Sequence, residues 1–327
     1  MGPADCVATI AVMLAYTSDR FVLPLPPGHR FPMEKYRLLQ EGVRASLPRI
    51  RLREAPSASD GELALAHSPA YIAAVADGML SAAQQREIGF PWSERMAERA
   101  RRSVGATIGA ARAAFDEGVG ANLAGGTHHA QGDRGSGFCV FNDVAVAARL
   151  MQAERSRTHG ERLRVAVVDL DVHQGNGTAA IFQGDASVFT LSLHGERNFP
   201  FRKEASDLDV ALPDGCRDAD YLAALDAALD ALWAAHAETP FGLVFYLAGA
   251  DPHENDRLGR LALTAAGLAE RDRRVLDAAR RRGLPVATSM AGGYGRVVAD
   301  TVALQLATLR AACDSWTAWQ AGRQSGA

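Results

Sequence analysis

The sequence predicts an α/β protein with a central, mostly parallel sheet flanked by helices. Two observations predict this fold class. Short apolar runs rich in β-branched residues alternate with longer segments whose apolar residues recur at helical spacing. The short runs also lack the alternation of polar and apolar residues expected of a half-exposed strand, which is typical of strands buried on both faces of a parallel sheet. Strands that alternate with helices favour parallel pairing.

Six short runs are expected to be strands. The first, residues 7–14, is too short to cross a membrane. The others are residues 121–124, 164–168, 187–191, 243–247 and 285–288. Helical spacing predicts helices at residues 69–83, 94–115, 143–154, 220–237, 263–282 and 298–313. No repeat or flexible linker divides the sequence, so residues 1–327 are expected to form a single domain.

The composition argues against several classes of protein. A net charge of −3 gives no basic footprint for nucleic acid, so no direct nucleic-acid partner is expected. The first apolar run follows an aspartate and not a basic segment, so neither a secretory signal nor a membrane partner is expected. The 4 cysteines are neither dense nor closely paired, which favours a reducing compartment and a cytoplasmic location.

Polar clusters follow four of the expected strands. Residues 169–173 follow one strand, Asp251 follows another, and the pair His128 and His129 and the glycine-rich turn at Tyr294 follow two more. Ligands of open α/β sheets bind beyond the carboxyl ends of the strands. The four clusters are therefore expected to meet in one crevice.

Three of these residues have the character of metal ligands. Asp171 and His173 are two positions apart on an extended segment, so their side chains point the same way, and Asp251 can supply a third ligand. Two oxygens and one nitrogen with open positions suit a catalytic Zn²⁺, or Fe²⁺ in the same geometry. The Asp-x-His pair alone is weak evidence, because a buried histidine is more often a core residue. Its glycine-rich loop strengthens the metal interpretation.

Catalytic roles follow if a metal is present. His128 and His129 offer a general base for water and a second donor, and Asp169 can orient one imidazole. Tyr294 can donate its hydroxyl to a developing oxyanion. The alternatives are two inert surface histidines and a structural tyrosine.

Five motifs occur in an order that resembles the histone deacetylase superfamily. They are Gly-Gly-Thr-His-His-Ala, Gly-Phe-Cys-Val-Phe-Asn-Asp, Asp-Leu-Asp-Val-His-Gln-Gly-Asn-Gly, Ala-Gly-Ala-Asp and Gly-Gly-Tyr. The resemblance covers nearly the whole chain, with a looser match in the N-terminal third. It implies an arginase/deacetylase-like three-layer fold with an eight-stranded, mostly parallel sheet, and a tunnel that leads an acyl-amine to zinc.

The resemblance also implies a role for each motif residue. It implies that Asp171, His173 and Asp251 bind one Zn²⁺. It implies that His129 is the general base and acid, that His128 is its electrostatic partner and that Tyr294 polarises the substrate carbonyl. Asp169 would hydrogen-bond His128. A structural K⁺ would be held by Asp169, Asp171, His173, Ser192 and Leu193, and the substrate tunnel would include Gly137, Phe138, Phe199, Leu258, Gly292 and Gly293.

Other positions bear on the branch of the family. Gln174 and Asn176 stand where many members have histidine and aspartate, and without that carboxylate His129 should be less basic. With residues 31–36, this pair resembles the class IV and bacterial branches. Arg37 would line an internal channel for product release by analogy with the family.

The implied reaction is zinc-dependent hydrolysis of an N-acyl amide, with N6-acyl-lysine in a protein or peptide as the favoured substrate. An acetylpolyamine amidohydrolase, which acts on a small acylated amine, is the alternative. Leu258 argues against it, because an acidic gatekeeper is expected at that position. A non-catalytic acyl-lysine binding module is a third possibility, although every expected ligand and catalytic residue is present. The sequence leaves the acyl chain and the oligomeric state open.

Overall fold

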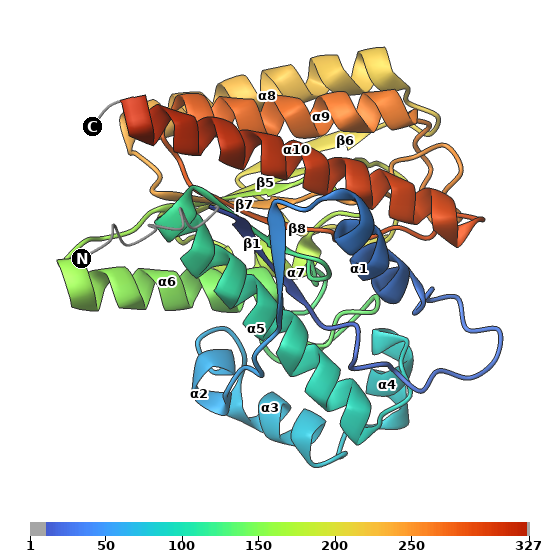
Figure 1. Ribbon diagram of the computed structural model, residues 1–327. Helices are drawn as coiled ribbons and strands as arrows, with labels where there is room; N and C mark the ends of the chain where they lie inside the picture. The colour runs from blue at the N-terminus through green and yellow to red at the C-terminus, as the bar shows by residue number, and fades with distance from the viewer. Residues whose placement is uncertain (1–10, 326–327) are drawn as a thin grey trace, which may run out of the picture.

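Eight strands form one sheet at the centre of this computed structural model, which describes residues 11–325. Their order is β2-β1-β3-β8-β7-β4-β5-β6, and every pairing is parallel, which confirms the predicted fold class (Figure 1). The strands are β1 (Met13–Thr17), β2 (Ile50–Glu54), β3 (Val119–Asn122), β4 (Val165–Asp169), β5 (Val188–Gly195), β6 (Leu208–Leu212), β7 (Leu243–Leu247) and β8 (Val286–Ser289).

Helices cover both faces of the sheet and complete three layers (Figure 1). One face packs against α1 (Lys35–Ser46), α8 (Asp218–Glu238), α9 (Ala265–Arg281) and α10 (Val298–Ser325). The other packs against α5 (Glu94–Glu117) and α6 (Asp143–His159). The shorter helices are α2 (Asp60–Leu63), α3 (Pro69–Ala76), α4 (Ala82–Ile88) and α7 (Asn176–Phe182). Within the described residues, none of the helices has the length and apolar character needed to span a membrane.

The central strands are the ones that the sequence predicts best. Every residue of β3, β4, β7 and β8 is buried, because helices cover both faces of the sheet there. The edge strands β2 and β6 expose several of their residues, carry charged side chains and were not predicted. Charged, short edge strands resist pairing with other chains, but they lack the apolar signal of a buried strand.

Several predicted elements were wrong in their extent, and the last helix, predicted to end at residue 313, continues to Ser325 as α10. The first strand is Met13–Thr17 and not residues 7–14, of which 7–10 lie outside the described residues. The predicted helix 69–83 is two helices, α3 and α4. Gly78 has a φ of 73°, and Ser81 starts α4 with a capping box in which it exchanges hydrogen bonds with Gln84. A left-handed residue followed by a helix cap ends one helix and begins another.

The register of the sheet brings the polar loops together. Asp169 at the end of β4 lies opposite Leu247 at the end of β7, which in turn lies opposite Ser289 of β8. Ser289 lies opposite Asn122 at the end of β3. The loops that follow these four neighbouring strands therefore leave the sheet side by side.

Arg271 on α9 ties two of these loops together from behind. Its side chain is buried, and its Nη1 donates to the carbonyl oxygens of Gly249 at 2.6 Å and Leu170 at 3.3 Å. Gly249 precedes Asp251, and Leu170 precedes Asp171. The guanidinium is paired with Asp272, whose carboxylate also accepts a hydrogen bond from Tyr246 at 2.5 Å. One planar fork thus fixes two ligand-bearing loops relative to each other.

Replacing Arg271 with lysine should lower the free energy of unfolding by about 1–3 kcal/mol, because at least one buried carbonyl loses its donor. Urea denaturation measures this change. Arg273→Lys on the exposed face of the same helix is the control and should leave the stability unchanged. Equal stability of the two variants would contradict the proposal that the Arg271 guanidinium stabilises the two loops.

Candidate metal centre and active site

A cavity of about 750 Å³ opens over the carboxyl ends of the strands. The loops after β3, β4 and β8 form its floor, and residues 137–141, 197–201 and 257–260 form much of its wall. The cavity therefore lies where the polar clusters were expected to meet.

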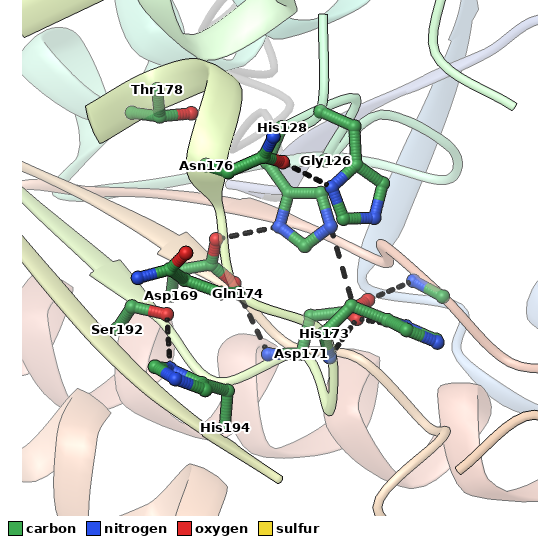
Figure 2. Close-up of polar contacts among 12 residues, drawn as sticks. Gly126, His128, Asp169, Asp171, His173, Gln174, Asn176, Thr178, Ser192 and His194 are labelled. Carbon is green, nitrogen blue, oxygen red and sulfur yellow. Dashed lines mark hydrogen bonds and ion pairs between the residues drawn. The ribbon is translucent and has the colours of Figure 1, made fainter. Parts of the chain in front are cut away.

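Asp171 and His173 line the floor of this cavity, and Asp251 lies beside them. Each is buried, and each offers a ligand atom within 4.8 Å of the others. His173 Nδ1 is 2.9 Å from Asp171 Oδ1 (Figure 2). The same nitrogen is 3.3 Å from Asp251 Oδ2. Among the described residues, Asp251 Oδ2 is buried without a hydrogen-bond partner. A carboxylate oxygen that is buried without a hydrogen-bond partner is suited to bind a cation.

The backbone around these carboxylates leaves room for an ion. A Cβ atom on Gly292 would lie 1.9 Å from Asp251 Oδ2 and 2.6 Å from Asp171 Oδ2. A Cβ on Gly249 would lie 2.8 Å from the Cα of Asp171. Any side chain at Gly292 would therefore occupy the space that faces both carboxylates, so only glycine keeps the site open.

The charge states of these three side chains also favour a bound cation. Burial, and then repulsion from Asp171, raise the pKa of Asp251 to about 7. Burial alone would lower the pKa of His173, but the carboxylates of Asp171 and Asp251 beside it raise that pKa to about 10. The protein thus stabilises a positive charge between two buried carboxylates. The donor set of two oxygens and one nitrogen fits a divalent metal at the same point.

His128 carries a second buried positive charge near this group. Its Nδ1–H donates to Asp169 Oδ2 at 2.6 Å, and its Nε2 is 3.9 Å from Asp171 Oδ1 (Figure 2). Burial alone would lower the pKa of His128, but Asp169 and Asp171 outweigh burial and raise it to about 9. At neutral pH His128 is therefore an imidazolium held by a carboxylate.

His129 has the opposite charge state. Its Nδ1 is 2.7 Å from the amide oxygen of Asn176, which can only accept, so Nδ1 carries the proton and Nε2 keeps its lone pair. Burial, and then the charges of His128 and His173, hold the pKa of His129 well below its ordinary value. Asn176 thus lies behind this imidazole, as the sequence motif predicts, and the less basic histidine is neutral at pH 7.

Tyr294 is held from three sides. Its backbone N–H donates to Asp256 Oδ2 at 2.6 Å, and its carbonyl accepts from Arg257 Nε at 2.9 Å. Its ring centroid lies 6.4 Å from that of His173. Burial, and then the charges of the two aspartates beside it, raise the pKa of Tyr294 well above its ordinary value, so the hydroxyl remains a donor. Sequence reasoning missed Asp256 and Arg257, because nothing local marks a residue that binds a backbone 38 positions away.

The prediction for Arg37 was wrong. Arg37 is exposed and pairs with Glu41 one helical turn away at 2.7 Å. Lys35, two positions earlier, is buried instead and lines the cavity. Its Nζ donates to the carbonyl of Gly293 at 3.2 Å and lies 5.2 Å from the ring centroid of Tyr294. Residues two apart on a helix face different directions, so only one of the two can point inward.

Five of the six expected tunnel residues line the cavity, and Gly293 does not. Gly137 and Phe138 have φ values of 54° and 66°, and a Cβ on Gly137 would lie 2.6 Å from the imidazole of His129. The ring of Phe199 stands perpendicular to that of His129 at 4.9 Å between centroids. Leu258 and Gly292 also line the cavity, while the carbonyl of Gly293 accepts from Lys35 beside it.

The residues expected to hold K⁺ lie on two neighbouring strands and on the loop that follows one of them. Asp169 ends β4 and pairs in the ladder with Ser192 of β5, and Leu193 follows Ser192. The hydroxyl of Ser192 contacts His194 Nδ1 at 3.0 Å (Figure 2). Asp171 and His173 follow in the adjacent loop. The strand pairing brings these residues together, and the cation itself stays a prediction.

His67 supports the loop that carries the two histidines. Its Nδ1–H donates to the carbonyl of Gln131 at 2.9 Å, and its Nε2 accepts from the backbone N–H of Asn142 at 2.9 Å. Asn142 caps α6 and donates to the carbonyl of Ala130 at 3.1 Å. Burial lowers the pKa of His67 to about 4. The neutral imidazole is required, because a protonated ring has no acceptor for the Asn142 N–H.

The protein should consequently lose stability as the pH falls below 6.5. The pKa of His67 is about 4 in the folded chain and 6.5 in the unfolded chain. Its contribution is complete above pH 6.5 and is lost between 6.5 and 4, since the unfolded chain binds the proton first. Between pH 7 and pH 5, the wild type should lose about 2 kcal/mol more than His67→Gln in urea denaturation. An equal loss in both proteins would contradict this prediction.

Comparison with known proteins identifies relatives along most of the chain. The histone deacetylase domain family matches residues 29–309. An uncharacterized protein of Picosynechococcus sp. is 44% identical over 299 residues, covering 90% of this chain and 96% of that protein. The histone deacetylase-like amidohydrolase of Pseudomonas aeruginosa is 34% identical over 294 residues, covering 83% and 74%. The crystal structure of a deacetylase homologue from Aquifex aeolicus shares the fold, with a TM-score of 0.75 and 23% identity over 94% of this chain and 84% of that one.

Proposed function

Because the chain belongs to the histone deacetylase family, we propose that it is a zinc-dependent hydrolase that removes the acyl group from N6-acyl-lysine in proteins or peptides. One observation carries the proposal. Asp171 and His173, which form a buried group with Asp251, lie at the floor of a cavity that the neutral His129 also lines. A metal site with a base beside it and open space above it is the arrangement that amide hydrolysis requires.

The metal and the protein have separate tasks in this proposal. Asp171, His173 and Asp251 would hold Zn²⁺, which would supply a Lewis acid for the amide carbonyl and would lower the pKa of a water molecule toward roughly 7. His129 accepts a proton from the attacking water at Nε2, because its Nδ1 is occupied by Asn176. The same nitrogen then donates that proton to the leaving amine, which completes the hydrolysis.

The other polar groups stabilise charge during the reaction. Tyr294 keeps its proton and donates a hydrogen bond to the oxyanion that develops on the substrate. His128 stays positively charged through Asp169 and favours the accumulation of negative charge beside it. Asp169 together with Asp171, His173, Ser192 and Leu193 would hold a structural K⁺ behind the metal loop. The acyl-amine enters between Phe138 and Phe199.

An acetylpolyamine amidohydrolase is the alternative function, since it would use the same centre. A polycationic substrate requires acidic side chains at the mouth, and Leu258 lines that part of the cavity. The alternative is therefore the less favoured of the two functions. A purely binding role is also disfavoured, because it does not explain a neutral histidine beside a metal site.

Hydrolysis can be tested on the protein reconstituted with Zn²⁺ or Fe²⁺ after removal of metal by a chelator. The substrates are neutral peptides that carry lysine acylated with chains of increasing length, together with acetylated polyamines. Metal-dependent release of free lysine peptide is expected, and the chain length that gives the highest kcat/KM identifies the acyl group. Turnover of polyamines alone would favour the alternative. Absence of hydrolysis with every substrate and both metals would overturn the proposed function.

A further inference from the structure

The mouth of the cavity is strongly basic, although the whole chain has a net charge of −3. Five exposed arginines line it, namely Arg30, Arg86, Arg197, Arg257 and Arg260. Among the described residues that line the cavity, the acidic side chains are Glu87 at the mouth and Asp171 at the floor. Positive charge is thus concentrated at the entrance and is not a property of the surface in general.

These arginines come from segments far apart in the sequence. Arg30 precedes α1, Arg86 lies in the last turn of α4, Arg197 follows β5, and Arg257 and Arg260 follow β7. A solvated helix face would place basic residues three or four positions apart on one element. Convergence of separate loops on one opening instead indicates that the charge is directed at what enters the cavity.

Much of this charge is not neutralised by the protein. Asp214 pairs with Arg260 at 3.1 Å and lies 4.0 Å from Arg197. In the part of the chain that the structure describes, Arg30 and Arg86 form no ion pair, and Arg257 binds backbone carbonyls only. The entrance therefore keeps an excess of positive charge that a bound anion would neutralise.

The entrance also offers an apolar contact beside the charges. Phe201 is 86% exposed, and its ring lies 6.3 Å from that of Phe199, which packs on His129. An exposed aromatic ring next to the tunnel suits the backbone and side chains of a peptide that lies across the mouth. A small free amine that enters the tunnel completely would not reach it.

We propose that the substrate is an acyl-lysine that lies in an acidic peptide segment, with aspartate or glutamate on one or both sides of the modified lysine. The inference rests on the proposed function, because it concerns the substrate of the same site. The acyl-lysine side chain enters the tunnel, and the flanking residues remain at the mouth, where the arginines attract carboxylates. The same charges repel polyamines and lysine-rich peptides.

The test compares three acetyl-lysine peptides of equal length, flanked by glutamate, by serine or by lysine. At about 50 mM salt, kcat/KM should follow the order acidic, neutral, basic, with roughly a 10-fold or larger span between the extremes. At about 500 mM salt the span should shrink, because the screening length falls to a few ångströms. Equal kcat/KM for the acidic and basic peptides at low salt would overturn the proposal.

Charge-reversal variants locate the effect. Arg30→Glu combined with Arg86→Glu should reduce or invert the preference without touching the metal group. Arg162→Glu is the matched control, because this exposed arginine precedes β4 at the opposite end of the sheet from the cavity. It should retain the preference. If the double glutamate variant unfolds, Arg30→Gln combined with Arg86→Gln should still reduce the preference for the acidic peptide. An unchanged preference in either double variant, when it is folded, would overturn the proposal.

Failure of this inference and failure of the proposed function give different results. Hydrolysis of the neutral peptide without any charge preference would overturn only the acidic substrate. Absence of hydrolysis for all three peptides, and for peptides with longer acyl chains and either metal, would overturn the proposed function. In that case, fluorescence anisotropy of the same labelled peptides on the zinc-loaded His129→Ala variant still decides the charge preference, with tighter binding of the acidic peptide as the expected result.

Discussion

Replacing His129 with alanine is expected to lower kcat by about 10²–10⁴-fold, the usual contribution of a general acid and base. In the structure this imidazole is buried, neutral and anchored through Nδ1 on Asn176, so its Nε2 is free to accept a proton. Alanine removes the acceptor for the water proton and the donor for the leaving amine. Steady-state hydrolysis of the best acyl-lysine peptide measures the loss.

The metal content is the control for this variant. His129 is not one of the three groups that face each other at the floor, so His129→Ala should bind as much zinc as the wild type by elemental analysis. Phe199 should be replaced by leucine in parallel, since it packs on the same imidazole without proton chemistry. Retention of wild-type kcat in His129→Ala with full zinc would refute the role of the histidine.

Replacing Asp251 with asparagine is expected to weaken zinc binding by more than the roughly 10- to 100-fold that loss of an outer hydrogen-bond partner costs. The substitution removes a negative charge and a ligand oxygen, while the amide oxygen can keep the hydrogen bond from the Val172 N–H that Asp251 Oδ1 now accepts at 2.9 Å. Competition with a zinc-binding dye measures the affinity, and hydrolysis should fall with metal occupancy.

In the metal-free protein, Asp251→Asn should not lower the stability of the fold, although the same variant weakens zinc binding. Burial and Asp171 raise the pKa of Asp251, so the neutral form of this group is favoured, and asparagine is neutral. For an acid whose pKa is raised on folding, stability is lost as the pH rises from the unfolded pKa through the folded one. At pH 8, metal-free Asp251→Asn should therefore be at least as stable as the metal-free wild type in thermal denaturation.

A surface carboxylate provides the comparison for both readouts. Asp116→Asn, on the exposed last turn of α5, should change neither the zinc affinity nor the stability of the metal-free protein. If Asp251→Asn binds zinc as tightly as the Asp116→Asn control, Asp251 is not a metal ligand. If the metal-free variant is much less stable than the control, the buried carboxylate has a structural role that the charge argument omits.

The sequence by itself determined the central strands and the order of the polar motifs. Helices cover both faces of β3, β4, β7 and β8, so these strands consist of apolar runs, and each is followed by a loop rich in glycine and polar residues. Both signals are local, because an apolar run indicates a buried strand and the glycines that follow it indicate a loop, and each can be recognised from neighbouring residues alone. Asp171, His173 and Asp251 are found in this way.

Only the tertiary structure decided the features that depend on distant residues. Lys35 faces the cavity and Arg37 faces solvent because of how α1 packs, which its amino-acid composition does not reveal. Arg271 binds the carbonyls of Leu170 and Gly249, about a hundred and about twenty residues away. The basic mouth is likewise invisible in a chain of net charge −3, since its arginines come from four separate segments. Such contacts are set by the packing of whole elements and the register of the sheet, and no local pattern of residues encodes them.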